Sequence, residues 1–283
     1  MLRIRVHLLN IMVSKGNKME LFVRKIFGSI DEVCIDANNI EQSMKWAFER
    51  GYTFISLNHT HGWVNGTSLA FLRDYPWVEG LWLVTENADI TPVNTLKNLK
   101  YFGSSKKELM GNMDFRNFPK LEFLVLNWNE KLFRNFDDCT SIKTLHLYDY
   151  PYINLSRLIR ASKLLYLEIY YAKKLVNLDG LENLKELTRI KINNAGKLND
   201  ISRLANISSS LKALSLEFTK SIRDYSVLEK LDNLEAAPQV MVSDGGPKKG
   251  VVLKKMLDDH RTYLLSFVTD TSSVIYHNVY HAL

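Results

Sequence analysis

Residues 164–192 read LLYLEIYYAKKLVNLDGLENLKELTRIKI, a stretch that contains one complete repeating unit and the start of the next. Leu164, Leu167 and Ile169 form the pattern LxxLxL, which returns at positions 187, 190 and 192. Apolar residues at alternate positions predict a short strand with one buried face. Between the two strands, leucine recurs at every third position from 175 to 184. That period predicts tight 3₁₀ turns, because an α-helix would repeat every 3.6 residues.

The same strand pattern recurs along most of the chain. Copies begin at intervals of 21–24 residues, and six of the seven have an apolar residue two positions later, with Ser104 as the exception. The three-residue step also recurs, over 90–99, 133–142 and 198–207. A fixed period of this length predicts a solenoid in which each unit packs on its neighbours. The copies start at Leu81, Phe102, Leu124, Leu145, Leu167, Ile190 and Leu214.

These repeats resemble a known family. The leucine step over 175–184 and the run Ile90-x₂-Val93-x₂-Leu96-x₂-Leu99 are similar to the bacterial internalin-type class of leucine-rich repeats. The resemblance implies an α/β fold: a leucine-rich-repeat solenoid, which is a right-handed β/3₁₀ superhelix with a parallel concave sheet and irregular capping ends. It also implies a protein that binds other proteins and carries no cofactor.

One departure from that class concerns the turns. The class places an Asn five residues after the first leucine of each strand, where its side chain bonds the turn backbone. Only Asn129 meets this expectation, so we expect the other turns to satisfy their backbone groups differently and to be less regular. The other residues at this position are Glu86, Lys107, Tyr150, Ala172, Ala195 and Thr219.

The ends of the chain follow the pattern less closely. We predict an N-terminal extension over 1–18, with Met19 as the natural start. An N-terminal cap or diverged repeats should cover 19–77, with strand, helix and strand over 31–57. Seven repeats then occupy 78–234. A C-terminal cap over 235–283 contains two candidate strands, at Val240/Val242 and Leu265/Phe267, joined by a helix over 250–260.

Charge and hydropathy limit the classes of partner and location. The formal charge is +6, and residues 1–18 alone contribute +4 of it, so the remaining chain shows no concentrated basic stripe in its sequence. We therefore expect no nucleic-acid partner. No segment approaches the roughly 18 uninterrupted apolar residues of a membrane span. The apolar stretch from Val6 to Val13 lacks a clear cleavage site, which favours a cytoplasmic location. A monomer is expected.

Candidate chemical groups are few. The triplet Cys34-Ile35-Asp36 superficially resembles the catalytic triplet of bacterial leucine-rich-repeat ubiquitin ligases, yet it lies in a strand-like segment. Two histidine pairs, at 59/61 and 277/281, have no carboxylate or cysteine nearby in sequence to complete a zinc site. Cys139 follows the apolar period and is interpreted as a buried hydrophobic residue. We expect no catalytic residue, metal or cofactor, and no enzyme.

The outward-facing positions of the strands define the predicted binding surface. In a strand, successive side chains point to opposite faces, so the residues between the leucines face the concave side. That set is rich in aromatic residues and nearly neutral, which points to a protein or peptide partner. In the alternative interpretation, some rings only cover the sheet. A secreted or surface internalin-like adhesin is the second hypothesis, and an enzyme using Cys34 is the third. The predicted partner-binding residues are Trp82, Tyr101, Phe123, Trp128, His146, Tyr148, Tyr166, Glu168, Tyr170, Tyr171, Arg189, Lys191 and Phe218.

Overall fold

The chain forms one long sheet of mostly parallel strands. The computed structural model describes residues 21–26, 30–104, 108–235 and 239–241. At the N-terminal end, β1 (Val23–Ile26) runs antiparallel to β2 (Ile30–Cys34). Each later strand of this sheet runs parallel to the one before it. These strands are β3 (Phe54–Asn58), β4 (Gly80–Val84), β5 (Tyr101–Ser104), β7 (Phe123–Asn127), β9 (Thr144–Tyr148), β10 (Tyr166–Tyr170), β11 (Arg189–Asn193), β12 (Ala213–Glu217) and β13 (Gln239–Met241).

Short 3₁₀ turns return the chain from one strand to the next. One α-helix, α1 (Ile40–Glu49), takes this place between β2 and β3, and a small parallel pair, β6 (Met113–Asp114) with β8 (Phe133–Arg134), lies outside the main sheet. The predicted leucine-rich-repeat solenoid with 3₁₀ turns is therefore confirmed. The turns are η1 (His59–His61), η2 (Ala70–Asp74), η3 (Thr91–Thr95), η4 (Phe115–Asn117), η5 (Phe136–Asp138), η6 (Ser156–Leu158), η7 (Leu181–Asn183), η8 (Ser202–Ile207) and η9 (Ser226–Lys230).

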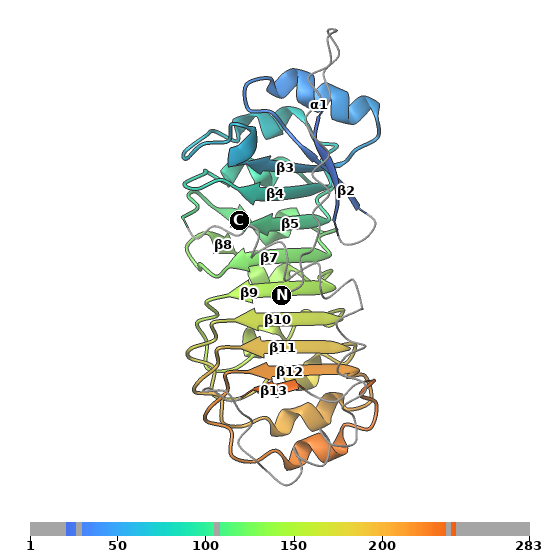
Figure 1. Ribbon diagram of the computed structural model, residues 1–283, viewed down its shortest axis with the longest axis vertical. Coiled ribbons are helices and arrows are strands. Elements are labelled where there is room, and N and C mark those ends of the chain that lie inside the picture. The colour runs from blue at the N-terminus through green and yellow to red at the C-terminus, as the bar shows by residue number, and fades with distance from the viewer. Residues whose placement is uncertain (1–20, 27–29, 105–107, 236–238, 242–283) are drawn as a thin grey trace, which may run out of the picture.

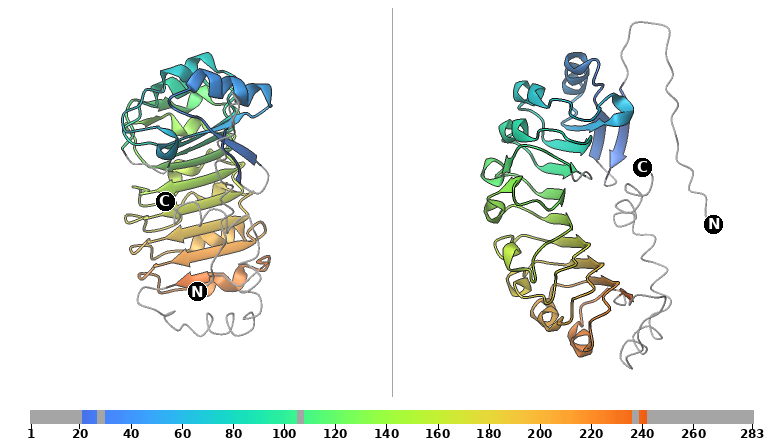
Figure 2. Two further views of the ribbon diagram at one scale, coloured as in Figure 1. Left: turned by 45° about the horizontal axis from the view of Figure 1, so that its top comes forward. Right: turned by 90° about the vertical axis from the view of Figure 1, so that its left-hand side faces the viewer.

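The solenoid is bowed, with the sheet on its inner side. In the right-hand view of Figure 2 the strands line the concave side and the 3₁₀ turns line the convex side. The arrowheads of β9 to β12 all point to the same side in Figure 1, so the turns that follow these strands form one row along that edge of the sheet. We call this row the carboxyl edge.

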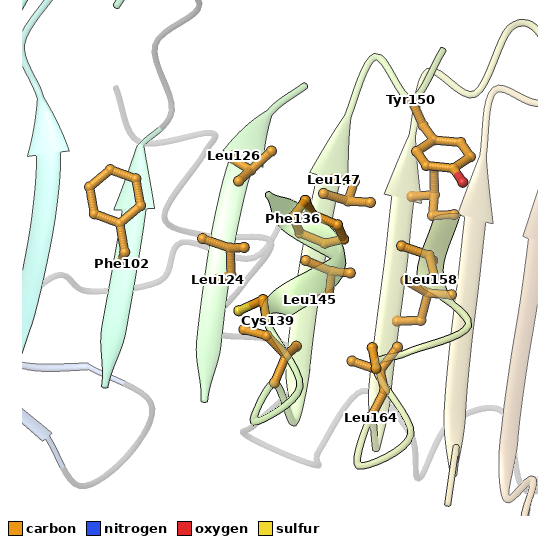
Figure 3. Packing of buried hydrophobic residues seen from close by; sticks show 14 of the residues in the cluster. Phe102, Leu124, Leu126, Phe136, Cys139, Leu145, Leu147, Tyr150, Leu158 and Leu164 are labelled. Atoms are coloured by element: carbon orange, nitrogen blue, oxygen red, sulfur yellow. The ribbon is translucent and has the colours of Figure 1, made fainter. Parts of the chain in front are cut away.

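The core runs along the whole solenoid between the strands and the turns. The strand residues Leu167 and Ile169 and the turn residues from the three-residue step, such as Leu178 and Leu181, are completely buried. Figure 3 shows the same arrangement one repeat earlier, where Phe136 and Cys139 from the convex side pack on Leu145 and Leu147. The apolar residues of the strands and the apolar residues of the turns thus form the two sides of one core.

The N-terminal region contains the predicted strand, helix and strand. β2, α1 and β3 occupy these positions, and β3 pairs in register with β4, with Ile55 opposite Leu81. Residues 58–77, which follow no repeat in sequence, pack into the core through Trp63, whose Nε1 donates a hydrogen bond to the Ile35 carbonyl oxygen at 2.6 Å. Parallel pairing thus extends well before Val78.

The C-terminal end is described as far as Met241. β13 contains Val240 and pairs with β12. Several predictions lie outside the described residues: the extension over 1–18, the helix over 250–260, a strand at Leu265/Phe267, and the histidines at 277 and 281.

Two of the turns that lack the Asn of the resembled class keep the backbone closure of the turn that has it. The N–H of Leu132 donates to the carbonyl of Asn129 at 3.1 Å, and the N–H of Leu175 donates equally to Ala172. Leu198 repeats this bond at 3.0 Å. Asn129 adds a bond that Ala172 and Ala195 cannot make, because its side-chain oxygen accepts from the N–H of Lys131 at 3.0 Å. The backbone closure is therefore shared by these three turns, while the side-chain bond of the resembled class is found at Asn129.

A second row of residues caps the convex turns. In each case a carboxylate or amide oxygen accepts a hydrogen bond from the backbone N–H two residues later, a local bond that Asp and Asn favour. We call this set the Asx row. It consists of Asp89, Asp114, Asn154, Asn177, Asp200 and Asp224.

Candidate interaction surface

The register of the sheet aligns the outward-facing residues in columns. Each strand places its equivalent residue directly beside that of the next strand, about 4.8 Å away. One column therefore runs His146, Glu168, Lys191 and Ser215, and a parallel one runs Tyr148, Tyr170, Asn193 and Glu217.

The half of the concave face over β3 to β7 is apolar. Trp82 and Phe123, both predicted to contact a partner, are buried there together with Phe54, Val84 and Val125. Gly103 makes this packing possible, because a Cβ at this position would overlap the Trp82 ring. The ring of Tyr101 lies 5.7 Å from that of Phe54 and 6.1 Å from that of Phe123. The rings in this half therefore pack on one another.

The half over β9 to β12 is polar and held in place by hydrogen bonds. The rings of Tyr148 and Tyr170 are stacked, with centroids 4.9 Å apart. The Tyr170 hydroxyl donates to Glu168 Oε2 at 2.6 Å. Burial and the neighbouring Glu168 carboxylate raise the pKa of Tyr170 well above its usual range, so the hydroxyl keeps its proton. Lys191 Nζ lies 5.7 Å from the centre of the Tyr170 ring.

Glu217 is the end point of this network. Lys191 Nζ lies 2.9 Å from Glu217 Oε1, while Asn193 and Ser215 donate to the same carboxylate at 2.5 and 2.9 Å. Burial alone would raise the pKa of Glu217, but the hydrogen bond and charge of Lys191, with the other two donors, lower it overall. The pair is therefore charged and fixed in geometry.

His146 lies between the apolar half and the polar half of the concave face. Its side chain is only 2% exposed, its ring centroid is 5.8 Å from that of Phe123, and its Nδ1 lies 3.7 Å from Glu168 Oε2. Burial lowers the pKa of His146 in spite of the opposing effect of Glu168, so the ring is neutral at pH 7. His146 is thus buried between Phe123 of the apolar half and Glu168 of the polar half.

Three predicted residues are clearly exposed. Tyr166 is 37% exposed on the concave face, with the guanidinium of Arg189 5.4 Å from its ring centre. Tyr171 and Phe218 are 46% and 40% exposed, and both lie at the carboxyl edge, directly after β10 and β12. Trp128 is placed elsewhere: it packs edge-on against Phe136, at 5.1 Å, in the turn that follows β7.

A group of cations was missed by the sequence analysis. The three turns that carry them are about 23 residues apart in the chain, so no basic stripe is visible in the sequence. The fold therefore corrects the prediction that the body of the chain has no concentrated basic region. The turns after β10, β11 and β12 bring them together at the carboxyl edge. We call this group the basic rim; it consists of Lys173, Lys174, Lys197, Lys220 and Arg223, all exposed.

Among the described residues, both candidate cysteines are buried. Cys34 is buried, and burial raises the pKa of its thiol to about 11, so it is protonated at neutral pH. Burial likewise raises the pKa of Cys139 to about 12. Among the described residues, no three His, Cys, Asp or Glu side chains lie close enough to hold a metal ion. In the same part of the chain, no helix is long and apolar enough to cross a membrane.

Comparison with known proteins supports the fold. No protein-family model matches the sequence, and no curated protein matches it significantly. Among solved structures, internalin C2 from Listeria monocytogenes is 18% identical, with a TM-score of 0.50 over 71% of this chain and 84% of its own. Internalin F of the same organism, at 16% identity, covers 78% of this chain and 88% of its own with a TM-score of 0.34. TLR13, solved with ssRNA13, is 19% identical over 72% of this chain and 34% of its own, with a TM-score of 0.46.

At these identities the likeness concerns the fold alone. Taken with the repeat pattern, the parallel sheet and the 3₁₀ turns, it defines the fold class: the chain has a leucine-rich-repeat solenoid fold.

Proposed function

We propose that this chain is a non-catalytic interaction module that binds a protein or peptide on its concave face over β9 to β11. We call this surface the tyrosine face; it consists of Tyr148, Tyr166, Glu168, Tyr170, Arg189 and Lys191. The observation that carries the proposal is the exposure of Tyr166 beside polar groups whose positions are already fixed. Aromatic and Arg side chains on a rigid surface contribute much of the free energy in protein interfaces.

The fixed hydrogen-bond network favours binding, because these side chains would lose little conformational freedom when a partner binds. Tyr170 is held between Tyr148 and Lys191, and its hydroxyl is bonded to Glu168. Side chains that are immobilised on association cost about 0.5–1.5 kcal/mol each, so a surface that is already ordered binds more tightly. Glu168 can accept a further hydrogen bond, since the contacts with Tyr170 and His146 both use Oε2.

The same geometry argues against catalysis at this face. Glu217 is neutralised by Lys191, and the Tyr170 hydroxyl stays protonated, so neither side chain is free to act as a base. The only candidate nucleophile considered in the sequence, Cys34, is protonated and buried. A binding role therefore accounts for the side chains better than the third hypothesis, an enzyme using Cys34.

Site-specific photo-cross-linking tests the proposal. Benzoylphenylalanine replaces Tyr166 on the tyrosine face or, as a control, Ile159 on the convex side, where 45% of the side chain is exposed. The two variants are irradiated in extract of the native host. We expect a discrete protein adduct from position 166 and none from 159. An adduct from 159 alone, or identical adducts from both, would contradict the proposal.

A cytoplasmic location is also part of the proposal, together with a protein or peptide as the partner. The second hypothesis, a secreted or surface adhesin, predicts that the native protein is found outside the cytoplasm. Fractionation of the host, with detection by antibody, separates these two. Protease accessibility on intact cells would favour the adhesin.

A further inference from the structure

The basic rim is a single patch built from three repeats. Residues 171–174, 194–197 and 218–223 follow β10, β11 and β12, and the parallel register places these turns side by side at the carboxyl edge (Figure 1). The turns carry four lysines and one arginine, and none contains an acidic residue. Lys220 extends along the neighbouring turn, since a Cβ on Gly196 would lie 3.4 Å from its Cε.

The rim cations are clustered and have no carboxylate partner among the described residues. Single exposed cations elsewhere, such as Lys163 and Lys185, also lack such a partner, whereas others are paired. Elsewhere in the solenoid, Lys100 pairs with Glu79 at 2.9 Å, and Arg203 pairs with Asp179 at 2.8 Å. Within the part of the chain that the structure describes, no rim cation forms an ion pair; Arg223 instead donates to the carbonyl of Lys220 at 2.9 Å. The rim therefore presents unneutralised positive charge.

Two exposed aromatic residues stand in the same row, and both have a strained backbone. Tyr171 has φ 58° and Phe218 has φ 56°, the left-handed region in which a Cβ is unfavourable. Asn194, at the equivalent position between them, is a residue that tolerates this conformation. Asp149 shares this φ in the preceding repeat, so the turn itself calls for the left-handed conformation, and Tyr171 and Phe218 adopt it although a ring-bearing residue is disfavoured there. Such outliers cluster at binding sites.

We infer that the basic rim docks an acidic linear segment of the protein partner, with an apolar side chain of that segment held between Tyr171 and Phe218. The inference rests on the proposed function and specifies the chemistry of its partner. The two aromatic positions are two strands apart, about 10 Å, which leaves room for one side chain above Asn194. Carboxylates of the segment pair with Lys173, Lys174, Lys197, Lys220 and Arg223.

The surroundings of the rim favour a short acidic peptide over a nucleic acid. Asp149 lies in the equivalent turn after β9. Asp224 directly follows the third rim turn, and Asp200 lies three residues after the second. Backbone N–H groups of Ser202 and Ser226 lower the pKa of these last two carboxyls, so they are charged at neutral pH. A long polyanion bound to the rim would extend past these carboxylates and be repelled by them. A short peptide would end before it reached them.

The test measures fluorescence anisotropy of a labelled short peptide in which glutamate and phenylalanine alternate. The full chain is compared with the variant Lys197→Glu/Lys220→Glu. A matched control, Lys163→Glu/Lys185→Glu, makes the same charge change at exposed residues that precede β10 and β11, on the opposite edge of the sheet. We expect at least tenfold weaker binding from the rim variant, less than a twofold change from the control, and loss of affinity with rising salt.

A second variant separates binding from folding. Phe218→Gly removes the ring and relieves the left-handed backbone, so we expect peptide affinity to fall while the thermal midpoint does not. A lower midpoint with unchanged affinity would show that Phe218 has a structural role and would overturn its place in the proposal.

Other outcomes overturn the inference as a whole. Absence of peptide binding at low salt would do so, as would equal binding of a peptide with glutamine in place of glutamate. Tighter binding of an oligothymidylate through the same lysines would replace the acidic peptide with a nucleic acid. If the rim variant still gives the adduct at position 166, the proposed function stands and the rim inference fails. If the natural chain binds the peptide through the rim lysines but gives no adduct at position 166, the proposed function of the tyrosine face fails and the rim is left only as a site for acidic peptides.

Discussion

Single residues decide how the concave face is packed. Gly103 is the clearest case, because the indole of Trp82 lies where a side chain at 103 would be. A glycine in a strand weakens that strand and often marks the close approach of another group. The alternation of the sequence shows that Trp82 points outward, but it does not show that its ring lies flat on the next strand.

Replacing Gly103 tests this packing. In Gly103→Ala the new methyl group forces the Trp82 ring to move, so we expect unfolding to become easier by about 1–3 kcal/mol, the usual cost of overpacking. Urea unfolding followed by fluorescence measures the change. Gly196→Ala is the control, since its Cβ meets only the flexible end of Lys220, and its effect should stay within about 0.5 kcal/mol. Equal effects at both positions would contradict the packing argument.

At the scale of elements, the convex turns depend on local caps. The Asx row satisfies a backbone N–H at the start of six convex turns, later in each repeat than the N–H that Asn129 bonds. Asp200 accepts from the N–H of Ser202 at 2.8 Å, and that bond lowers the pKa of the carboxyl. The chemistry of Asp and Asn at turn starts is visible in the sequence, but the row is recognised only once the turns are aligned by the fold.

The Asx row predicts a dependence of stability on pH. Asp200→Ala removes one cap and should cost about 1 kcal/mol, by analogy with helix caps. Because the folded-state pKa is lowered, the charge-dependent stabilisation is fully present above the unfolded-state value, about 3.9, and is lost as pH falls through the folded-state value. Asp200→Asn, which keeps the acceptor oxygen as Asn154 and Asn177 do, should lose less stability than Ala and flatten this acid transition. Thermal midpoints between about pH 2 and 7 check both expectations. An Ala variant whose midpoint equals that of the natural chain would refute the capping role.

At the scale of the whole molecule, the solenoid behaves as a stack of interchangeable units. Tyr166 pairs with Arg189 across β10 and β11, so residues 166–188 make one full repeat. Each unit packs only on its neighbours, so stability is close to a sum of unit and interface contributions.

Deleting one repeat in register tests this description. Removal of 166–188 places Arg189 beside Thr144, keeps every column aligned, and should give a chain that unfolds cooperatively at a lower midpoint. Removal of 166–177 breaks the alignment of strand with strand and should leave the chain unfolded or aggregated. Circular dichroism during heating distinguishes the two. If both deletions fold equally well, the repeat boundaries drawn from the register are wrong.

The amino-acid sequence by itself determined the repeat, its 3₁₀ turns and the direction of each strand side chain, because a period of two and a period of three are local properties of a chain. The tertiary structure alone decided which outward residues are exposed: it buried Trp82, Phe123 and His146, and left Tyr166, Tyr171 and Phe218 accessible. It also gathered the cations of the basic rim from three distant segments. Exposure and charge density depend on what lies beside a residue in space, and in this solenoid the nearest neighbour of a side chain is one full repeat away in the sequence.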